Sequence, residues 1–505
     1  MDNTKLGQLR ERLAEIRDLN AASAVLSWDQ STYMPPGGGA ARARQMATLG
    51  RIAHEKATDP ALGRLLDELR PLAESLPYDS DDASLVRVAL RDYERNARVP
   101  PAFMAGLYEH TATMYERWAA ARPANDFAAV ADGLERTVEL SRELAGFFPG
   151  YAHIADPLIA LADDDVLVSD IRPLFAELRS RLVPLVEAVT AQPPADDSCL
   201  RRGFPVDAQL AFGEEIARAL GYDLRRGRQD LTHHPFCTTF SVGDVRITTR
   251  ARADDVSDAF FSTVHEVGHA MYEQGVAEAL DGTPLMGGTS AGVHESQSRL
   301  WENLVGRSRG FWEFCYPRLQ ARFPDQLGDV PMETFYRAVN KVQRSLIRTD
   351  ADELTYNLHV IIRFDLELEL LDGSLAVRDL PEAWRERYRR DLGTAPHDDR
   401  DGVLQDVHWY AGVVGGAFHG YTLGNILSAQ FYDAALRVHP EIPEQIRRGE
   451  FGTLHGWLTE QIYRHGRKLT ASEVTQRAAG GPLSVEPYIA YLRRKYGELY
   501  RLSAE

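Results

Sequence analysis

The sequence predicts a mostly helical protein with one small β-hairpin. Apolar residues recur at helical spacings along most of the chain, for example Leu174, Leu178 and Leu182, and again Leu358 and Ile362. Strand signals are scarce by comparison. With 505 residues, of which 44% are apolar, the chain is long enough to bury a large core.

The β-hairpin is predicted at residues 238–249. Thr238–Val242 and Val245–Thr249 are rich in β-branched and aromatic residues, and Gly243-Asp244 between them forms a two-residue turn. A polar connection follows, and we expect Ser257 or Asp258 in it to cap a helix that begins at Ala259.

We predict a single domain over residues 1–505. The chain contains no long Gly/Ser-rich or Pro-rich linker and no repeat, and its best composition break, Ala191–Ser198, is interpreted as a loop between helices.

The net charge and the cysteine content of the chain indicate its binding partners and its cellular compartment. The formal net charge of −17 makes nucleic acid and anionic membrane surfaces poor partners. The N-terminus lacks the pattern of a secretory signal, and no apolar stretch is long enough to span a bilayer. Three widely separated cysteines favour a reducing compartment, so we expect a cytoplasmic protein.

The residues that indicate chemistry lie directly after the hairpin. His265-Glu266-Val267-Gly268-His269 is a His-Glu-x-x-His pattern on the predicted helix. Residues four apart share one helical face, so His265 and His269 can bind one metal ion, with Glu266 beside it as general base. Two histidines on a half-buried helix would be the alternative interpretation.

A catalytic zinc site normally takes a third protein ligand. A third histidine shortly after the motif is ruled out, because Tyr272 and Gly275 occupy the positions that need Gly and His. The next predicted helix offers Glu295 and Glu302, about two turns apart. We choose Glu295, with Glu302 either bonded to a ligand or solvated. His294 is an alternative third ligand, but we expect it to be bonded to nearby backbone.

Two neutral histidines and one carboxylate on zinc give the bound water a pKa near about 7. Glu266 can then take the proton of this water as it attacks a carbonyl. The pattern therefore predicts hydrolysis of an amide or ester with one divalent metal ion. Zinc is our first choice, although cobalt and manganese suit the same ligands.

Further motifs along the chain extend this pattern. In order, they are Trp28–Gly37, Gly227–Asp230, His234-Pro235-Phe236, Asp244–Thr248, the metal helix, His294–Gln297, Ile347–Asp352 and Gly402–Trp409. With these motifs in this order, the sequence closely resembles the carboxypeptidase Taq family of metallocarboxypeptidases.

The resemblance implies a two-lobed helical fold with a deep active-site groove, similar to neurolysin and the angiotensin-converting enzymes, with a zinc-site core at about residues 227–425. It also implies a homodimer that removes single C-terminal residues from peptides with broad specificity. A neurolysin-like oligopeptidase, a dipeptidyl carboxypeptidase and a silent peptide-binding module are the alternatives.

A carboxypeptidase must recognise a free carboxylate, and arginine does this best. Arg348 is our first choice, because we expect its segment to belong to a helix, and Arg246 on the hairpin is the second. Structural ion pairs, with Asp352 and Asp244 respectively, are the alternative roles.

An oxyanion needs a donor besides the metal, and Tyr421 and His408 are the candidates. His234 could bond the substrate backbone or be a core histidine. Gln405 and Asp406 are expected to orient ligands. Cys237 lacks any cysteine-peptidase context and is interpreted as a small apolar side chain.

Overall fold

The structure is a computed structural model that describes residues 2–502. It divides into two compact units, each built from three stretches of the chain. Unit 1 comprises the residues up to Arg98 together with Asp197–Val339 and Phe431–Pro482, and unit 2 comprises Val99–Asp196, Asn340–Gln430 and the residues from Leu483.

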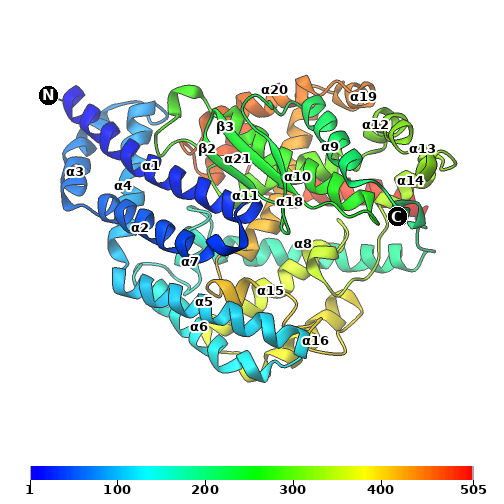
Figure 1. Ribbon diagram of the computed structural model, residues 1–505, viewed down its shortest axis with the longest axis horizontal. Helices are drawn as coiled ribbons and strands as arrows, with labels where there is room; N and C mark the ends of the chain where they lie inside the picture. The colour runs from blue at the N-terminus through cyan, green and yellow to red at the C-terminus, as the bar shows by residue number, and fades with distance from the viewer. Residues whose placement is uncertain (1, 503–505) are drawn as a thin grey trace. The chain divides into compact units, whose positions relative to one another are not determined.

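Unit 1 contains the only sheet found within residues 2–502, together with many helices (Figure 1). Its helical elements are α1 (Asp2–Thr32), η1 (Pro36–Gly38), α2 (Gly39–Ala57), α3 (Pro60–Ser75), α4 (Asp81–Arg98), η2 (Ser198–Arg201), α9 (Val206–Leu220), α10 (Val256–Gly275), η3 (Glu278–Leu280), α11 (Ala291–Arg299), the π-helical η4 (Leu300–Val305), α12 (Arg309–Arg322), α13 (Pro324–Leu327), α14 (Met332–Val339), α19 (Ile442–Arg448), α20 (Gly452–Gln461), η7 (Tyr463–His465) and α21 (Ala471–Ala479).

Within its described residues, unit 2 contains helices and loops but no strand. Its elements are α5 (Pro101–Ala124), α6 (Ala128–Gly146), α7 (Asp156–Ala160), α8 (Val168–Thr190), η5 (Arg348–Asp350), α15 (Tyr356–Asp372), η6 (Val377–Asp379), α16 (Leu380–Leu392), α17 (His408–Ala411) and α22 (Glu486–Tyr500), and α18 (Phe418–Val438) begins in it. The predicted apolar stripes lie on α8 and α15, where Leu178, Leu182, Leu358 and Ile362 are completely buried. The mostly helical fold class is therefore confirmed.

The sheet has three strands in the order β1-β3-β2. β2 (Cys237–Ser241) and β3 (Asp244–Thr249) are antiparallel, with Thr239 opposite Val245, as the predicted hairpin requires. β1 (Gln229–Leu231) pairs parallel with β3. β1 is absent from the prediction because a three-residue strand is too short for an alternating pattern to be recognised.

Helix α10 follows the sheet and begins earlier than predicted. Its cap is Asp255, whose carboxylate accepts hydrogen bonds from the backbone N–H groups of Ser257 and Asp258. The prediction of Ser257 or Asp258 as cap is wrong, because these two residues already lie in the first turn and supply the unpaired N–H groups.

Helices α10 and α11 approach each other backbone to backbone at Gly268. A Cβ atom on Gly268 would lie 2.6 Å from the carbonyl oxygen of Gln297 and from Cα of Ser298. A larger residue would therefore push α11 away from α10. The close approach brings Glu295 on α11 to the helix that carries the two histidines.

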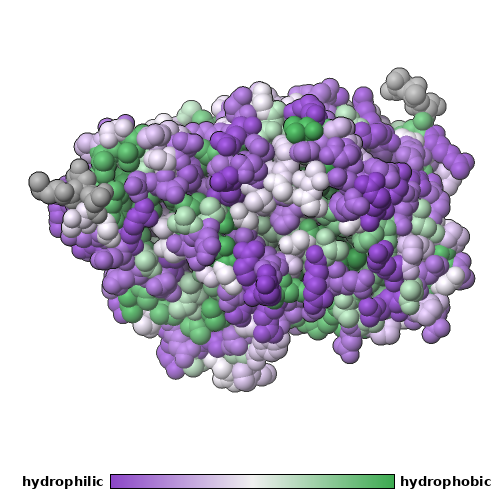
Figure 2. Space-filling view, turned by 90° about the horizontal axis from the view of Figure 1, so that it is seen from above, coloured by the Kyte–Doolittle hydropathy of each residue, from purple (hydrophilic) through white to green (hydrophobic). Residues whose placement is uncertain are grey.

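None of the helices within residues 2–502 combines the length and the apolar character needed to cross a lipid bilayer. On the face seen in Figure 2, hydrophilic residues predominate and hydrophobic residues form smaller groups among them.

Gly268→Ala tests whether this close approach matters. We expect the added methyl group to lower the free energy of unfolding by about 1–3 kcal/mol through overpacking. The same variant should bind a divalent metal more weakly, because α11 carries Glu295. Thermal unfolding and chelator competition measure the two effects.

The matched control is Gly50→Ala on α2, where a Cβ atom meets nothing within 4 Å. This control should leave stability unchanged or raise it by up to about 1 kcal/mol. Equal behaviour of the two variants would contradict the packing argument.

Candidate metal centre

Three side chains of unit 1 converge where a metal ion was predicted. His265 and His269 lie one turn apart on α10, and Glu295 lies on α11. One ligand atom from each of them lies within 4.8 Å of the others. Glu295 Oε2 is 3.8 Å from Nε2 of His265 and 3.4 Å from Nε2 of His269. Both histidines therefore turn the same nitrogen toward the carboxylate.

The other ring nitrogen of His265, Nδ1, donates a hydrogen bond to Glu302 Oε2 at 2.9 Å. Burial acts to raise the pKa of Glu302, but the His265 hydrogen bond and the charges of Arg299 and Arg307 lower it to about 2. Glu302 is thus ionised and can only accept. This contact leaves the lone pair of His265 at Nε2, the arrangement that carboxylates provide for metal-binding histidines.

His269 is held differently. Its Nδ1 lies 2.6 Å from Nδ1 of His294, and Nε2 of His294 lies 2.8 Å from Glu273 Oε1. The expectation that the His294 side chain bonds to backbone is wrong, because the close approach of α11 to α10 brings its ring to His269.

The protonation of the group suits a divalent cation. Burial lowers the pKa of His269 to about 4, so this imidazole is neutral near pH 7. Burial opposes ionisation of Glu295, yet the neighbouring charges of Arg299 and His265 hold its pKa well below the usual range. Two imidazoles beside a carboxylate are the ligand set of many catalytic metal sites.

Glu266 stands next to His265 on α10 and is buried. Burial is the main reason why the pKa of Glu266 rises to about 7, while the His265 charge acts in the opposite direction. A carboxyl group with this pKa can accept or release a proton near neutral pH.

Arg299 fixes the orientation of the third predicted ligand. Its Nε donates to Glu295 Oε1 at 2.7 Å and its Nη1 donates to Glu302 Oε2 at 3.3 Å. Glu295 Oε1 is therefore taken up, while Oε2 faces the histidines.

Arg299 and Glu273 have no role in the site predicted from the sequence. Each lies four residues after a predicted ligand on the same helix, Arg299 after Glu295 and Glu273 after His269. That spacing is the signal that could have found them.

The predicted substrate arginine, Arg348, belongs to a second group in unit 2. Its Nε donates to Asp406 Oδ2 at 2.6 Å and its Nη1 donates to the Tyr356 hydroxyl at 3.0 Å. Asp406 Oδ2 also forms an ion pair with Arg363, whose Nε lies 3.3 Å away, so two guanidinium groups share one carboxylate.

The segment of Arg348 is helical only as the short 3-10 helix Arg348–Asp350. The alternative of an ion pair between Arg348 and Asp352 is not found: the acidic partner of Arg348 is Asp406, while Asp352 accepts hydrogen bonds from the backbone N–H groups of Leu354 and Thr355.

His408 and Tyr421 lie together in the same unit. Nδ1 of His408 bonds to Asp406, and its Nε2 lies 3.2 Å from the Tyr421 hydroxyl. Gln405 accepts hydrogen bonds from the backbone N–H of Arg348 and from the Arg363 side chain. Gln405 therefore contacts Arg348 and Arg363, and Asp406 contacts Arg348 and His408. Their expected role in orienting ligands stays a prediction.

Arg246 and His234 lie in unit 1, on or beside the sheet. The Arg246 guanidinium makes two hydrogen bonds to Asp244 and lies 4.3 Å from the centre of the Trp28 ring. The alternative of an ion pair with Asp244 is thus present. His234 is exposed in the loop between β1 and β2, so its interpretation as a core histidine is wrong.

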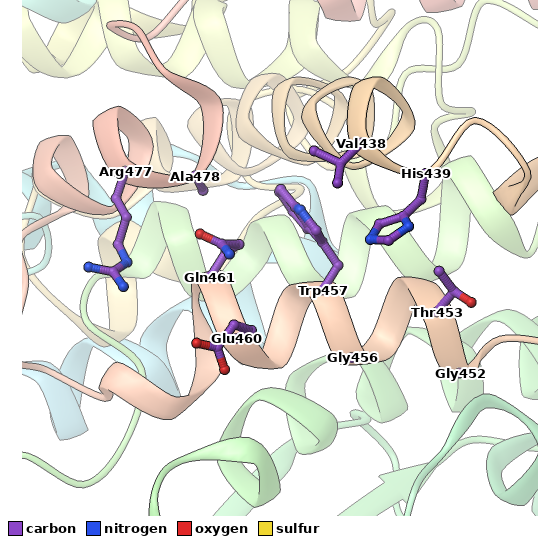
Figure 3. Close-up of a pocket in the computed structure, with 10 residues that line it drawn as sticks. All are labelled: Val438, His439, Gly452, Thr453, Gly456, Trp457, Glu460, Gln461, Arg477 and Ala478. Carbon is purple, nitrogen blue, oxygen red and sulfur yellow. The ribbon is translucent and has the colours of Figure 1, made fainter.

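A separate pocket of about 610 Å³ in unit 1 shares no residue with the metal group. In Figure 3, side chains from the end of α18, from α20 and from α21 line it, including His439, Trp457 and Arg477. None of the predicted functional residues lies there.

Comparison with known proteins adds independent information. Residues 8–496 match the family model described as carboxypeptidase Taq (M32) metallopeptidase. The chain is 42% identical over 504 residues to thermostable carboxypeptidase 1 of Thermus thermophilus, which covers 97% of this chain and 98% of that protein. It is 37% identical to carboxypeptidase 1 of Bacillus subtilis, with 97% of each chain covered.

Solved structures agree with these matches. A crystal structure of an M32 carboxypeptidase from Deinococcus radiodurans R1 superposes with a TM-score of 0.96 at 51% identity. The alignment covers 99% of this chain and 100% of the other.

Glu302→Gln tests the contact that holds His265. Burial lowers the pKa of His265, but Glu295 and Glu302 more than offset this and raise it, so a proton competes with the metal as the pH falls. We expect the variant to bind Zn²⁺ about 10–100-fold more weakly at pH 8. Loss of binding should also set in at lower pH, because one of the carboxylates that raise the pKa of His265 is gone.

The dissociation constant, measured by chelator competition between about pH 5.5 and pH 8.5, checks both effects. Glu278→Gln, at an exposed carboxylate of η3, is the control and should behave as the unmodified protein. An unchanged affinity and pH midpoint in Glu302→Gln would contradict the role of this contact.

Proposed function

The chain belongs to the carboxypeptidase Taq (M32) family of metallopeptidases, and from this premise we propose that it releases single C-terminal residues from peptides by metal-assisted hydrolysis at the His265, His269 and Glu295 site. It is a metallocarboxypeptidase and a peptide hydrolase. The observation that carries the proposed site is the convergence of three ligand atoms within 4.8 Å, beside the buried carboxyl group of Glu266.

We propose zinc as the metal, with cobalt or manganese as chemically suitable substitutes. A divalent ion held at this site supplies Lewis acidity toward a carbonyl and lowers the pKa of a coordinated water. Two imidazole nitrogens and one carboxylate oxygen leave a coordination position free for that chemistry.

Glu266 is the proposed general base. It cannot share the ligand face of His265 and His269, because adjacent residues of a helix point in different directions. Its buried carboxyl group, with a pKa of about 7, can take a proton from the attacking water and pass it to the leaving amine.

Arg348 is the proposed partner of the substrate carboxylate. Arg348 and Arg363 share the single negative charge of Asp406, so this region keeps a surplus of positive charge that suits an anion. The charge of Arg246, by contrast, is matched by the carboxylate of Asp244, to which its guanidinium donates two hydrogen bonds. This difference supports Arg348 over Arg246.

His408 and Tyr421 remain the proposed donors to the developing oxyanion, and His234 a proposed contact of the substrate backbone. A phenol or an imidazole can donate to negative charge that forms on a carbonyl oxygen. The bond of His408 to Asp406 supports a fixed orientation of its ring.

We further propose broad side-chain specificity, a homodimer and a cytoplasmic location. The first two rest on the family resemblance. The third is supported by the cysteines, because none of Cys199, Cys237 and Cys315 is in a disulfide, as is typical of a reducing compartment.

The decisive activity test uses an N-acetylated peptide, with either a free or an amidated C-terminus, followed by mass spectrometry. We expect a ladder that shortens by one residue at a time, from the free C-terminus alone, and that stops when a chelator removes the metal. Release of dipeptides or internal cleavage would instead indicate a dipeptidyl carboxypeptidase or an oligopeptidase.

Glu266→Gln should lower kcat by about 10²–10⁴-fold, because the amide cannot accept the proton. Metal binding should persist, since the ligands are unchanged. Retained activity in a variant that is fully loaded with metal would rule out Glu266 as the base.

Arg348→Lys should lower kcat/KM for peptides with a free C-terminus by about 10–100-fold, the value of a charge-assisted hydrogen bond. The matched Arg246→Lys variant should change it by less than about 3-fold. Steady-state kinetics on the two peptides decides between the arginines. A larger loss in Arg246→Lys would reverse the assignment.

A further inference from the structure

The side chain of His294 has two polar contacts, and both involve residues of helix α10. Nδ1 of His294 is 2.6 Å from Nδ1 of His269, and Nε2 of His294 is 2.8 Å from Oε1 of Glu273. All three residues belong to unit 1. Glu273, His294 and the candidate metal ligand His269 thus form a chain of two hydrogen bonds.

The direction of each hydrogen bond in this chain follows from Glu273, which lies at one end of it. Glu273 Oε1 also receives the backbone N–H of Gly288 at 3.0 Å, so it acts as an acceptor on two sides. The proton between Glu273 and His294 therefore lies on Nε2 of His294. With the proton on Nε2 directed to Glu273, Nδ1 of His294 is left to accept from Nδ1–H of His269.

This hydrogen bond determines the state of Nε2 of His269, the nitrogen proposed to bind the metal. With its proton on Nδ1, His269 carries its lone pair on Nε2, the atom 3.4 Å from Glu295 Oε2. The opposite tautomer would put a hydrogen on Nε2 and block metal binding there.

The surroundings keep the His294 ring in this place. A Cβ atom on Gly288 would lie 2.3 Å from Cδ2 of His294, so the absence of a side chain at Gly288 makes room for the ring. The ring of Tyr272 also packs against the His294 ring, with 5.4 Å between the two ring centres. The backbone N–H of His294 bonds to the carbonyl of Ser290 in the first turn of α11.

We propose that His294, backed by Glu273, is a positioning residue that fixes the tautomer and the ring orientation of His269 for metal binding. This inference rests on the proposed metal site. The carboxylate of Glu302 fixes the tautomer and ring orientation of His265 directly, whereas the carboxylate of Glu273 acts on His269 through the imidazole of His294.

An intervening imidazole has a physical advantage at this place. Glu266, Glu295 and Glu302 already put three carboxyl groups around the two histidines. A fourth carboxylate in direct contact with His269 would add like charge in a buried region. His294 places the charge of Glu273 one ring further away and still provides an acceptor.

The test uses two substitutions of His294 in the full-length protein. His294→Leu removes both hydrogen bonds. His294→Asn keeps an acceptor, because the amide oxygen of Asn occupies about the place of Nδ1. The readouts are the Zn²⁺ dissociation constant by chelator competition and the visible spectrum of the Co²⁺-loaded protein, which reports coordination geometry.

We expect His294→Leu to weaken Zn²⁺ binding by about 10–100-fold and to change the Co²⁺ spectrum. His294→Asn should recover binding to within a few-fold of the unmodified protein, with its original spectrum. Unchanged affinity in His294→Leu, or equal losses in both variants, would overturn the proposal. Either result would mean that an acceptor at position 294 does not contribute to metal binding.

Two further variants separate this proposal from the metal site itself. Tyr272→Phe is the matched control, since it keeps the ring beside His294 and removes only the hydroxyl that accepts from the Thr289 N–H. It should bind Zn²⁺ as the unmodified protein does. His265→Gln should lose Zn²⁺ binding, and retained binding in this variant would contradict the proposed metal site. If His265→Gln loses binding while His294→Leu binds normally, the metal site stands and only the role of His294 is contradicted.

Discussion

The arrangement of the proposed metal centre depends on one constraint: Nδ1 of each of the two histidines proposed as ligands already contacts another side chain of the protein. His265 donates to Glu302, and His269 lies against His294. Each contact fixes a tautomer, so both Nε2 atoms are left to face Glu295. Without these contacts, the imidazoles could rotate or exchange tautomers, and the ligand atoms would not be held in one geometry.

The fold meets this constraint through the packing of two helices. The four-residue spacing of His265 and His269 places them on one face of α10, and Gly268 between them allows the α11 backbone to approach closely. α11 then contributes both Glu295 and His294. One short helix therefore supplies a proposed ligand of the metal and the partner of another, so a shift of α11 would disturb both at once.

Much of this could be predicted from the sequence, and the remainder has clear physical reasons. The helices, the hairpin and the histidine pair follow from short-range periodicity, which a sequence displays directly. The partner of Arg348 could not be predicted in this way: Asp406 is distant in sequence, while the nearer Asp352 is drawn to backbone N–H groups. His294 was misjudged for the same reason, since its contacts depend on the packing of α10 against α11.

The most direct test of this account is a crystal structure of the Zn²⁺-loaded protein with anomalous scattering recorded at the zinc absorption edge. The account predicts one strong peak, bound by Nε2 of His265, Nε2 of His269 and one oxygen of Glu295. Nδ1 of both histidines should still contact Glu302 and His294. A peak elsewhere, or coordination through either Nδ1, would contradict the claim that these contacts prepare the site for the metal.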